Sequence, residues 1–184
     1  MIGRDAALAL VRERVLNTNL VNHSVATEII MEALARRFGL ADDDVARWAL
    51  TGLLHDLDYT ETAEDFDRHG LLTAEMLADE IDGEMLHAIL AHANKVPRES
   101  PMDRALFAAD PMTGFITAAA LVRPDKSLAA VEVRSLLKRW KEKAFARGAN
   151  REQMGVCEEL SMSREEFLSL GLEAMQARAG EIGF

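Results

Sequence analysis

The segment Leu53-Leu54-His55-Asp56-Leu57-Asp58 ends an apolar stretch that begins at Val45. Histidine and aspartate lose hydration when they are buried, so an adjacent pair at the end of an apolar helix indicates that something binds them. A metal cation suits this role, because imidazole nitrogen and carboxylate oxygen are both ligands for Zn, Fe, Mn and Ni. One His and one Asp leave most coordination positions open. The remaining ligands must therefore come from elsewhere in the chain.

The composition predicts a single all-α domain over residues 1–184. The chain has 184 residues, 49% of them hydrophobic and 28% charged, which is enough for one substantial core and too short for two domains of ordinary size. Aromatic residues make up only 5%, whereas Ala, Leu and Met are plentiful, and this balance favours helices over sheets.

The charge and cysteine content bear on partners and location. A net charge of −10 argues against binding to a nucleic acid duplex or to an anionic membrane surface. The single Cys157 and the absence of an early apolar run lead us to expect a cytoplasmic protein. The most apolar window, 105–122, contains Asp110 and Pro111, so we interpret it as a buried helix and expect no membrane contact.

Apolar residues at helical spacing predict a helical bundle of about eight helices. The longer ones are expected over residues 5–16, 20–38, 45–57, 69–80, 84–94, 102–122 and 127–146. Capping patterns start a short helix at Asn150 and a last helix at Ser163, and the polar stretch 59–68 is expected to be a loop. The core is placed at about residues 20–151, and residues 161–184 are expected to form a C-terminal packing helix without a catalytic part.

Six side chains suited to metal binding lie at the ends of these helices or within apolar ones. They are His23, His55, Asp56, His69, His92 and Asp110. Each has an alternative interpretation when taken singly: His69 as a helix cap, His92 as a residue favoured at a helix C-terminus, and His23 as a hydrogen-bonded core histidine. In a helical bundle such groups can also converge on one internal site.

The order and context of these residues resemble the HD superfamily of metal-dependent phosphohydrolases. Its pattern is an early His, a His-Asp doublet about thirty residues later and a late Asp on a helix. Three phrases carry a closer resemblance to small HDIG-related proteins: 55–59 (HDLDY), 109–116 (ADPMTGFI) and 143–151 (KAFARGANR). The doublet is followed by Leu57-Asp58 in place of the Ile-Gly of the HDIG pattern.

The resemblance implies an HD-domain helical bundle with one or two divalent transition metals, drawn from Fe, Mn, Co, Ni and Zn. The first metal would be held by His23, His55, Asp56 and Asp110, and the second by His69, His92 and the shared Asp56. His87 has no counterpart in the family pattern. It lies five residues before His92, and on a helix the two side chains would point about 140° apart.

The implied activity is hydrolysis of a phosphate ester or anhydride, on a small phosphorylated molecule or nucleotide, by water activated at the metal. Asp56 and Asp58 are the predicted catalytic residues. Asp58 would move a proton or orient the water, and it is equally well interpreted as a loop carboxylate. Lys95 and Arg147 are the predicted phosphate contacts.

Arg147 lies in a basic region, since residues 123–151 carry nine Lys or Arg and three Asp or Glu. That balance of +6 leaves −16 for the remainder of the chain. The basic helix face within this region has the alternative interpretation of a solvated surface.

Two other functions fit the same residues. A di-iron oxygenase of the HD type would use the same six ligands, and a regulatory HD domain would bind a nucleotide without turnover. The six metal-type residues count against the regulatory domain, because binding alone does not require them. An oligomer is possible, but nothing in the sequence indicates one.

Overall fold

The computed structural model describes residues Met1 to Phe184 and contains only helices. The bounds are α1 Arg4–Arg14, α2 Thr18–Arg37, α3 Asp42–Leu54, α4 Tyr59–Thr62, η1 Phe66–Arg68, α5 Leu71–Leu77, α6 Gly83–His92, α7 Pro101–Leu121, α8 Val133–Trp140, α9 Arg151–Gly155, η2 Val156–Leu160, α10 Arg164–Ala177 and η3 Ala179–Ile182, where η marks a 3-10 helix. The predicted all-α class is confirmed, although ten α-helices are present where about eight were expected. None of them is long and apolar enough to span a bilayer.

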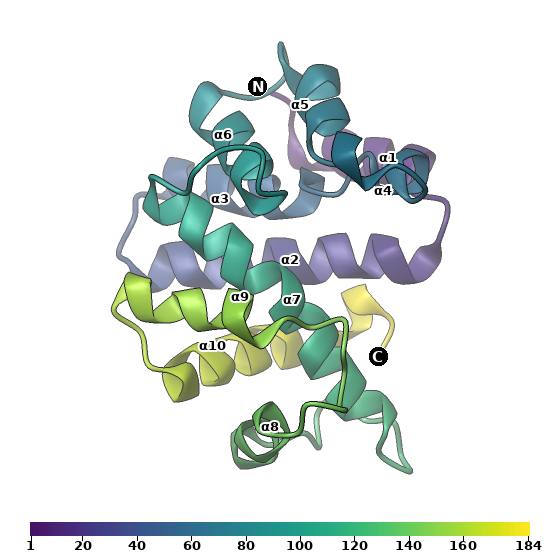
Figure 1. The fold of residues 1–184 in the computed structure, drawn as a ribbon, viewed down its shortest axis with the longest axis vertical. Helices are drawn as coiled ribbons and strands as arrows, with labels where there is room; N and C mark the ends of the chain where they lie inside the picture. Colours follow the sequence, from purple (N-terminus) through teal and green to yellow (C-terminus); the bar gives the residue numbers. More distant parts are fainter.

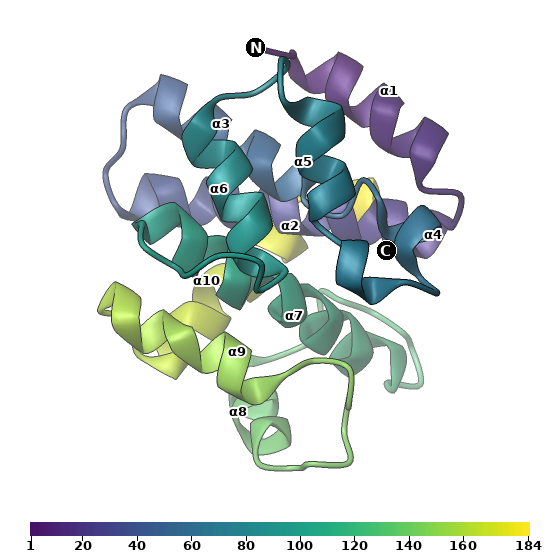
Figure 2. The same ribbon diagram turned by 45° about the horizontal axis from the view of Figure 1, so that its top comes forward.

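Two long helices, α2 and α7, form the centre of the molecule and cross one another (Figure 1). Helix α3 packs along α2 on one side and α10 packs on the other, while α6 packs on α7. Figure 2 shows α6 and α5 side by side, with α4 beyond them. One cluster of 46 buried hydrophobic residues extends from Ala7 in α1 to Ile182 near the C-terminus, so the helices share a single core.

The close packing of α2 and α3 depends on glycine at position 52. A Cβ atom there would lie 2.7 Å from the carbonyl oxygen of Thr27, so any side chain would push the two helices apart. Because the three nearest atoms, in Thr27 and Glu28, all belong to the backbone, neither helix can relax by moving a side chain. Gly52 therefore brings the C-terminal end of α3 close to the middle of α2.

The predicted long helix over residues 127–146 is wrong, since only Val133–Trp140 is helical and turns follow it. The ring of Phe115 in α7 contacts both Trp140 and Phe145, at centroid distances of 6.1 and 5.5 Å. On one continuous helix two side chains five residues apart would point about 140° apart. Packing of both rings on Phe115 therefore requires the chain to leave the helix between them.

The stretch 59–68, predicted to be a loop, contains the short helices α4 and η1. The buried hydroxyl of Thr62 at the end of α4 donates to the carbonyl oxygen of Asp58 at 3.0 Å. This hydrogen bond pairs the Thr62 hydroxyl with a backbone carbonyl inside a stretch that was expected to be an irregular loop. Helix α7 continues without interruption through Pro111.

Candidate metal centre

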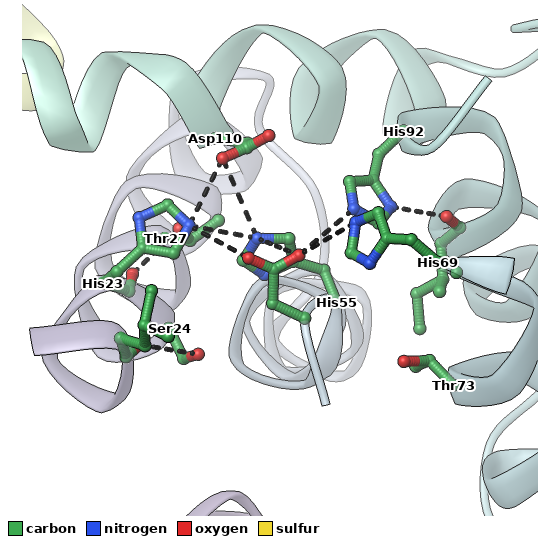
Figure 3. A network of polar contacts seen from close by, with 12 residues as sticks. His23, Ser24, Thr27, His55, His69, Thr73, His92 and Asp110 are labelled. Carbon is green, nitrogen blue, oxygen red and sulfur yellow. Dashed lines mark hydrogen bonds and ion pairs between the residues drawn. The ribbon is translucent and has the colours of Figure 1, made fainter. Parts of the chain in front are cut away.

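Five segments bring the predicted ligands together (Figure 3). They supply, in chain order, His23 from α2, His55 and Asp56 from the turn after α3, His69 from the turn before α5, His92 from the last position of α6, and Asp110 from α7. The helix predicted over 45–57 ends earlier, at Leu54, and the helix predicted over 69–80 begins later, at Leu71. Three of the six side chains therefore lie in turns, where the backbone can direct them toward one point.

A second glycine brings the turn before α5 against the end of α6. Gly70 has a φ of +78°, and a Cβ atom there would lie 2.6 Å from the Cβ of Ala93. Both the backbone conformation and the close approach require glycine at this position. As a result the imidazoles of His69 and His92 pack edge to face, with centroids 5.1 Å apart.

Asp56 lies at the middle of the cluster. Its Oδ1 is 3.4 Å from Nε2 of His55, of His69 and of His92. Its Oδ2 is 3.5 Å from Nε2 of His23. These side chains form two groups that share Asp56, one with His23 and His55 and one with His69 and His92, each with ligand atoms within 4.8 Å of one another.

Asp110 adds a second carboxylate to the group that contains His23. Its Oδ1 lies 3.2 Å from Nε2 of His23 and 3.9 Å from Nε2 of His55. The structure thus divides the six residues in the way that the family resemblance implies. Their role as ligands stays a prediction.

The other ring nitrogen of each histidine is anchored away from the centre. Nδ1 lies 2.6 Å from the Thr113 hydroxyl in His23, 2.8 Å from the Gly52 carbonyl in His55, 2.8 Å from the Asp58 carboxylate in His69, and 2.5 Å from the Ile89 carbonyl in His92. Three of these partners only accept, and the Thr113 hydroxyl donates to the carbonyl of Asp110 at 2.8 Å. Nδ1 therefore carries the proton in each neutral ring, which leaves Nε2 of that ring free to face Asp56 with its lone pair.

This donor set fits a divalent transition metal. Without a cation, the lone pairs of three neutral imidazoles face one carboxylate oxygen at 3.4 Å, which is repulsive. Nε2 of His92 is buried and has no hydrogen-bond partner. Leaving such a nitrogen unpaired costs about 1–3 kcal/mol. A cation among these nitrogen and oxygen atoms removes both costs, and mixed imidazole and carboxylate ligands suit Fe, Mn, Co, Ni or Zn.

The titration behaviour of the cluster also reflects its need for positive charge. Desolvation lowers the pKa of His23, but hydrogen bonds and charges from Asp110 and Asp56 outweigh it and raise that pKa to about 10. Desolvation raises the pKa of both carboxyls, but the neighbouring imidazoles outweigh it and hold both pKa values below the usual range. In the metal-free protein a proton on His23 therefore occupies part of the place that a cation would take.

The centre is most open to solvent at Asp110 and His23. The side chains of Asp110 and His23 are 26% and 20% exposed, whereas that of His55 is 0% exposed and that of His92 is 2% exposed. A small molecule would therefore approach between α2 and α7.

Asp58 is fully enclosed by hydrogen bonds. Its Oδ1 accepts from Nδ1 of His69 at 2.8 Å, and its Oδ2 accepts from the backbone N–H groups of Gly70 at 2.7 Å and Thr73 at 3.0 Å. Desolvation raises the pKa of Asp58, but these hydrogen bonds outweigh it and lower the pKa. The side chain is 0% exposed, so the geometry favours a role in positioning His69 over the predicted proton transfer.

The two predicted phosphate contacts lie apart from the six residues. The Lys95 ammonium donates to the carbonyl oxygens of Phe66 at 3.2 Å and Asp67 at 2.8 Å, so it fastens the turn that precedes His69. Arg147 lines a separate pocket of about 420 Å³, which none of the predicted metal ligands lines. Contact of either residue with substrate stays a prediction.

His87 lies outside both ligand groups. Its Nδ1 is 3.1 Å from Oδ2 of Asp103, which forms a capping box with Ser100 at the start of α7.

Sequence reasoning did not identify Thr113, Gly52 and Gly70 as parts of the site. Thr113 had a recognisable signal, because a threonine hydroxyl commonly bonds to the carbonyl three residues earlier, here that of Asp110. The glycines had a weaker one, since an isolated glycine in a helical pattern often marks a close approach.

The fold and the site together define an all-α protein with a carboxylate–histidine centre between its helices. The model of the HD domain family matches residues 20–113, just over half of the chain, and the chain belongs to this family. The matched range contains all six residues of the centre. HD domains form a superfamily of metal-dependent phosphohydrolases. A search of curated proteins found no match to the chain, and a search of solved structures found none either.

Proposed function

We propose that the protein is a metal-dependent phosphohydrolase that cleaves a phosphate ester or anhydride of a small molecule, with nucleotides among the candidates. The proposal rests on the position of Asp56. Its Oδ1 lies 3.4 Å from three imidazole nitrogens, and the two groups of candidate ligands both include it. A divalent metal bound there lowers the pKa of a water and offsets charge on a phosphoryl oxygen. In the reaction the water oxygen bonds to phosphorus, the bond to the leaving oxygen breaks, and the leaving group departs with a proton.

The side chains around the centre would orient the metal ligands, balance the charge of the cation and leave an opening for substrate. The Nδ1 anchors of the four histidines fix the ring orientations, so that the Nε2 atoms need no rearrangement to bind. The buried Asp56 and the partly exposed Asp110 compensate the charge of a bound cation. The opening at His23 and Asp110 admits the substrate, while the other imidazoles stay shielded from water.

The test is phosphate release from a panel of phosphate esters and anhydrides by protein loaded with Mn, Co, Ni, Fe or Zn. We expect activity in the absence of oxygen, since hydrolysis needs only water. Asp56→Ala should abolish it, and His87→Ala should retain it, because His87 lies outside both ligand groups. Oxygen uptake on an organic substrate without phosphate release would instead favour oxygenase chemistry, and tight binding of a nucleotide recovered unchanged would favour the regulatory domain.

A further inference from the structure

A pocket of about 300 Å³ opens beside the metal centre, between α2, α7 and the C-terminal residues 182–184. The C-terminal segment lies next to the N-terminal half of α2 (Figure 1). The polar lining comprises Asn19, Asn22, His23, Thr113 and Thr117, and Phe184 forms part of the wall. Its volume lies at the lower end of the range for small-molecule sites, which begins at about 300 Å³.

The pocket adjoins the side of the centre that solvent reaches. His23 lines the pocket and is also one of the two most exposed of the predicted ligands, at 20%. Thr113 lines it too and anchors Nδ1 of His23 at 2.6 Å. His23 is the only one of the six predicted ligands that lines the pocket, so the group attached to a phosphate at the metal centre would reach the pocket by passing over the His23 ring.

The chemistry of the lining selects for an uncharged polar group. Asn19, Asn22 and Thr117 offer amide and hydroxyl groups that both donate and accept hydrogen bonds. No Lys, Arg, Asp or Glu lines the pocket. A further phosphate or carboxylate would lose hydration there without a cation to compensate it, whereas hydroxyl and amide groups would find partners.

The C-terminal segment is fitted closely to this wall. Gly183 has a φ of +85°, and a Cβ atom there would lie 2.7 Å from Nδ2 of Asn22. Glycine therefore lets the backbone pass directly against the amide of Asn22. This contact makes the segment part of the pocket, beyond the packing role expected for residues 161–184.

We propose that this pocket binds the leaving group of the substrate, and that the group is an uncharged, hydroxyl-rich alcohol such as a sugar or nucleoside. The proposal rests on the proposed function for the phosphate, and it assigns Asn22 and Thr117 as specificity-determining contacts. It predicts a preference for monophosphate esters over substrates that carry further phosphates.

The test compares two isosteric variants, Asn22→Leu and Thr117→Val, on metal-loaded protein. Losing one hydrogen bond should lower kcat/KM for AMP and ribose 5-phosphate about fivefold, through KM. Turnover of p-nitrophenyl phosphate, whose leaving group offers no sugar hydroxyls to bind, should fall less than turnover of AMP and ribose 5-phosphate. Thr18→Val is the matched control, because Thr18 lies on the same helix and does not line the pocket. Metal content by elemental analysis should stay equal in all of them.

Binding of adenosine and ribose, measured by NMR on the metal-loaded protein, separates this proposal from the proposed function. If no phosphate ester is cleaved but adenosine or ribose binds and Asn22→Leu weakens that binding, the hydrolase assignment fails and the pocket stands. If the esters are cleaved but both variants change all substrates by one factor, the pocket assignment fails and the hydrolase stands. Absence of adenosine and ribose binding in the wild type also overturns the pocket assignment.

Discussion

At the scale of single residues, the centre depends on anchors that are not themselves ligands. Each histidine ring is held through Nδ1 by a different partner, which leaves Nε2 directed at Asp56. The resemblance to the HD superfamily identified the six predicted ligands in the sequence, and in the structure their side chains lie close together. The anchor from Thr113 to His23 joins residues 90 positions apart in the chain, so the local spacing that indicates the bond from Thr113 to Asp110 does not indicate this one.

Replacing Asp58 with Asn should weaken metal binding without unfolding the protein. The amide keeps the shape of the carboxylate but removes the charge that holds the Nδ1–H of His69. Loss of such a supporting partner typically costs about 10–100-fold in metal affinity. Competition with a metal-binding dye measures the affinity, and circular dichroism reports the helix content. Unchanged affinity would show that Asp58 does not position His69.

The raised pKa of His23 makes the stability of the metal-free protein depend on pH. A folded-state pKa of about 10, against an ordinary value of 6.5, contributes stability that is full below pH 6.5 and is lost as pH rises through about 10. In the absence of metal, the wild type should therefore be more stable than His23→Gln at low pH. This difference in the free energy of unfolding should decrease as the pH rises from 6.5 to about 10. Urea denaturation at several pH values measures the difference. A difference that rises with pH would contradict the assignment.

Metal binding should have the opposite pH dependence. A metal at Nε2 of His23 must displace its proton, so affinity should increase with pH, with release of about one proton per chain from this residue.

At the scale of the elements, the sequence pattern predicted the central helices well. It failed where packing between distant segments determines where a helix begins or ends. The helices expected over 20–38 and 102–122 closely match α2 and α7. The spacing of apolar residues within each segment is enough to indicate these helices. The helix expected over 127–146 is interrupted because Trp140 and Phe145 both pack on Phe115. Nothing within the segment itself indicates that break.

Gly52→Ala should destabilise the protein and weaken its metal site together. The new Cβ would meet the carbonyl of Thr27 at 2.7 Å, so α3 would have to move away from α2. Overpacking of this kind typically costs about 1–3 kcal/mol. Gly114→Ala in α7 is the matched control, because its Cβ meets nothing within 4 Å. The control should gain about 0.5–1 kcal/mol. Equal free energies of unfolding for the two variants would refute this account of the α2–α3 crossing.

At the scale of the whole molecule, the centre joins α2, α3, α6, α7 and the turn before α5. Those segments carry the predicted ligands from position 23 to position 110, so the centre brings together elements that are distant in sequence. A cation bound there would stabilise the folded chain and not the unfolded one. Within the basic region 123–151, Arg123, Arg134 and Arg139 pair with nearby carboxylates, whereas Lys138, Lys141, Lys143 and Arg147 form no ion pair.

Removal of metal should therefore lower the unfolding temperature. At metal concentrations about a hundredfold above the dissociation constant, binding adds about 2.7 kcal/mol. Thermal unfolding with and without a chelator measures the shift, and re-addition of Mn or Fe should restore it. The Asp56→Ala variant should show no chelator effect. A wild type that is indifferent to both chelator and metal would contradict a structural contribution from the centre.

The most direct test is elemental analysis of untagged protein purified without added metal. Two ligand groups that share Asp56 predict two ions per chain in the wild type and in His87→Ala, and none in Asp56→Ala. Circular dichroism should show the same helix content in all three proteins. Absence of metal from the wild type, even after anaerobic reconstitution with Fe or Mn, would contradict the assignment of the centre, as would full occupancy in Asp56→Ala.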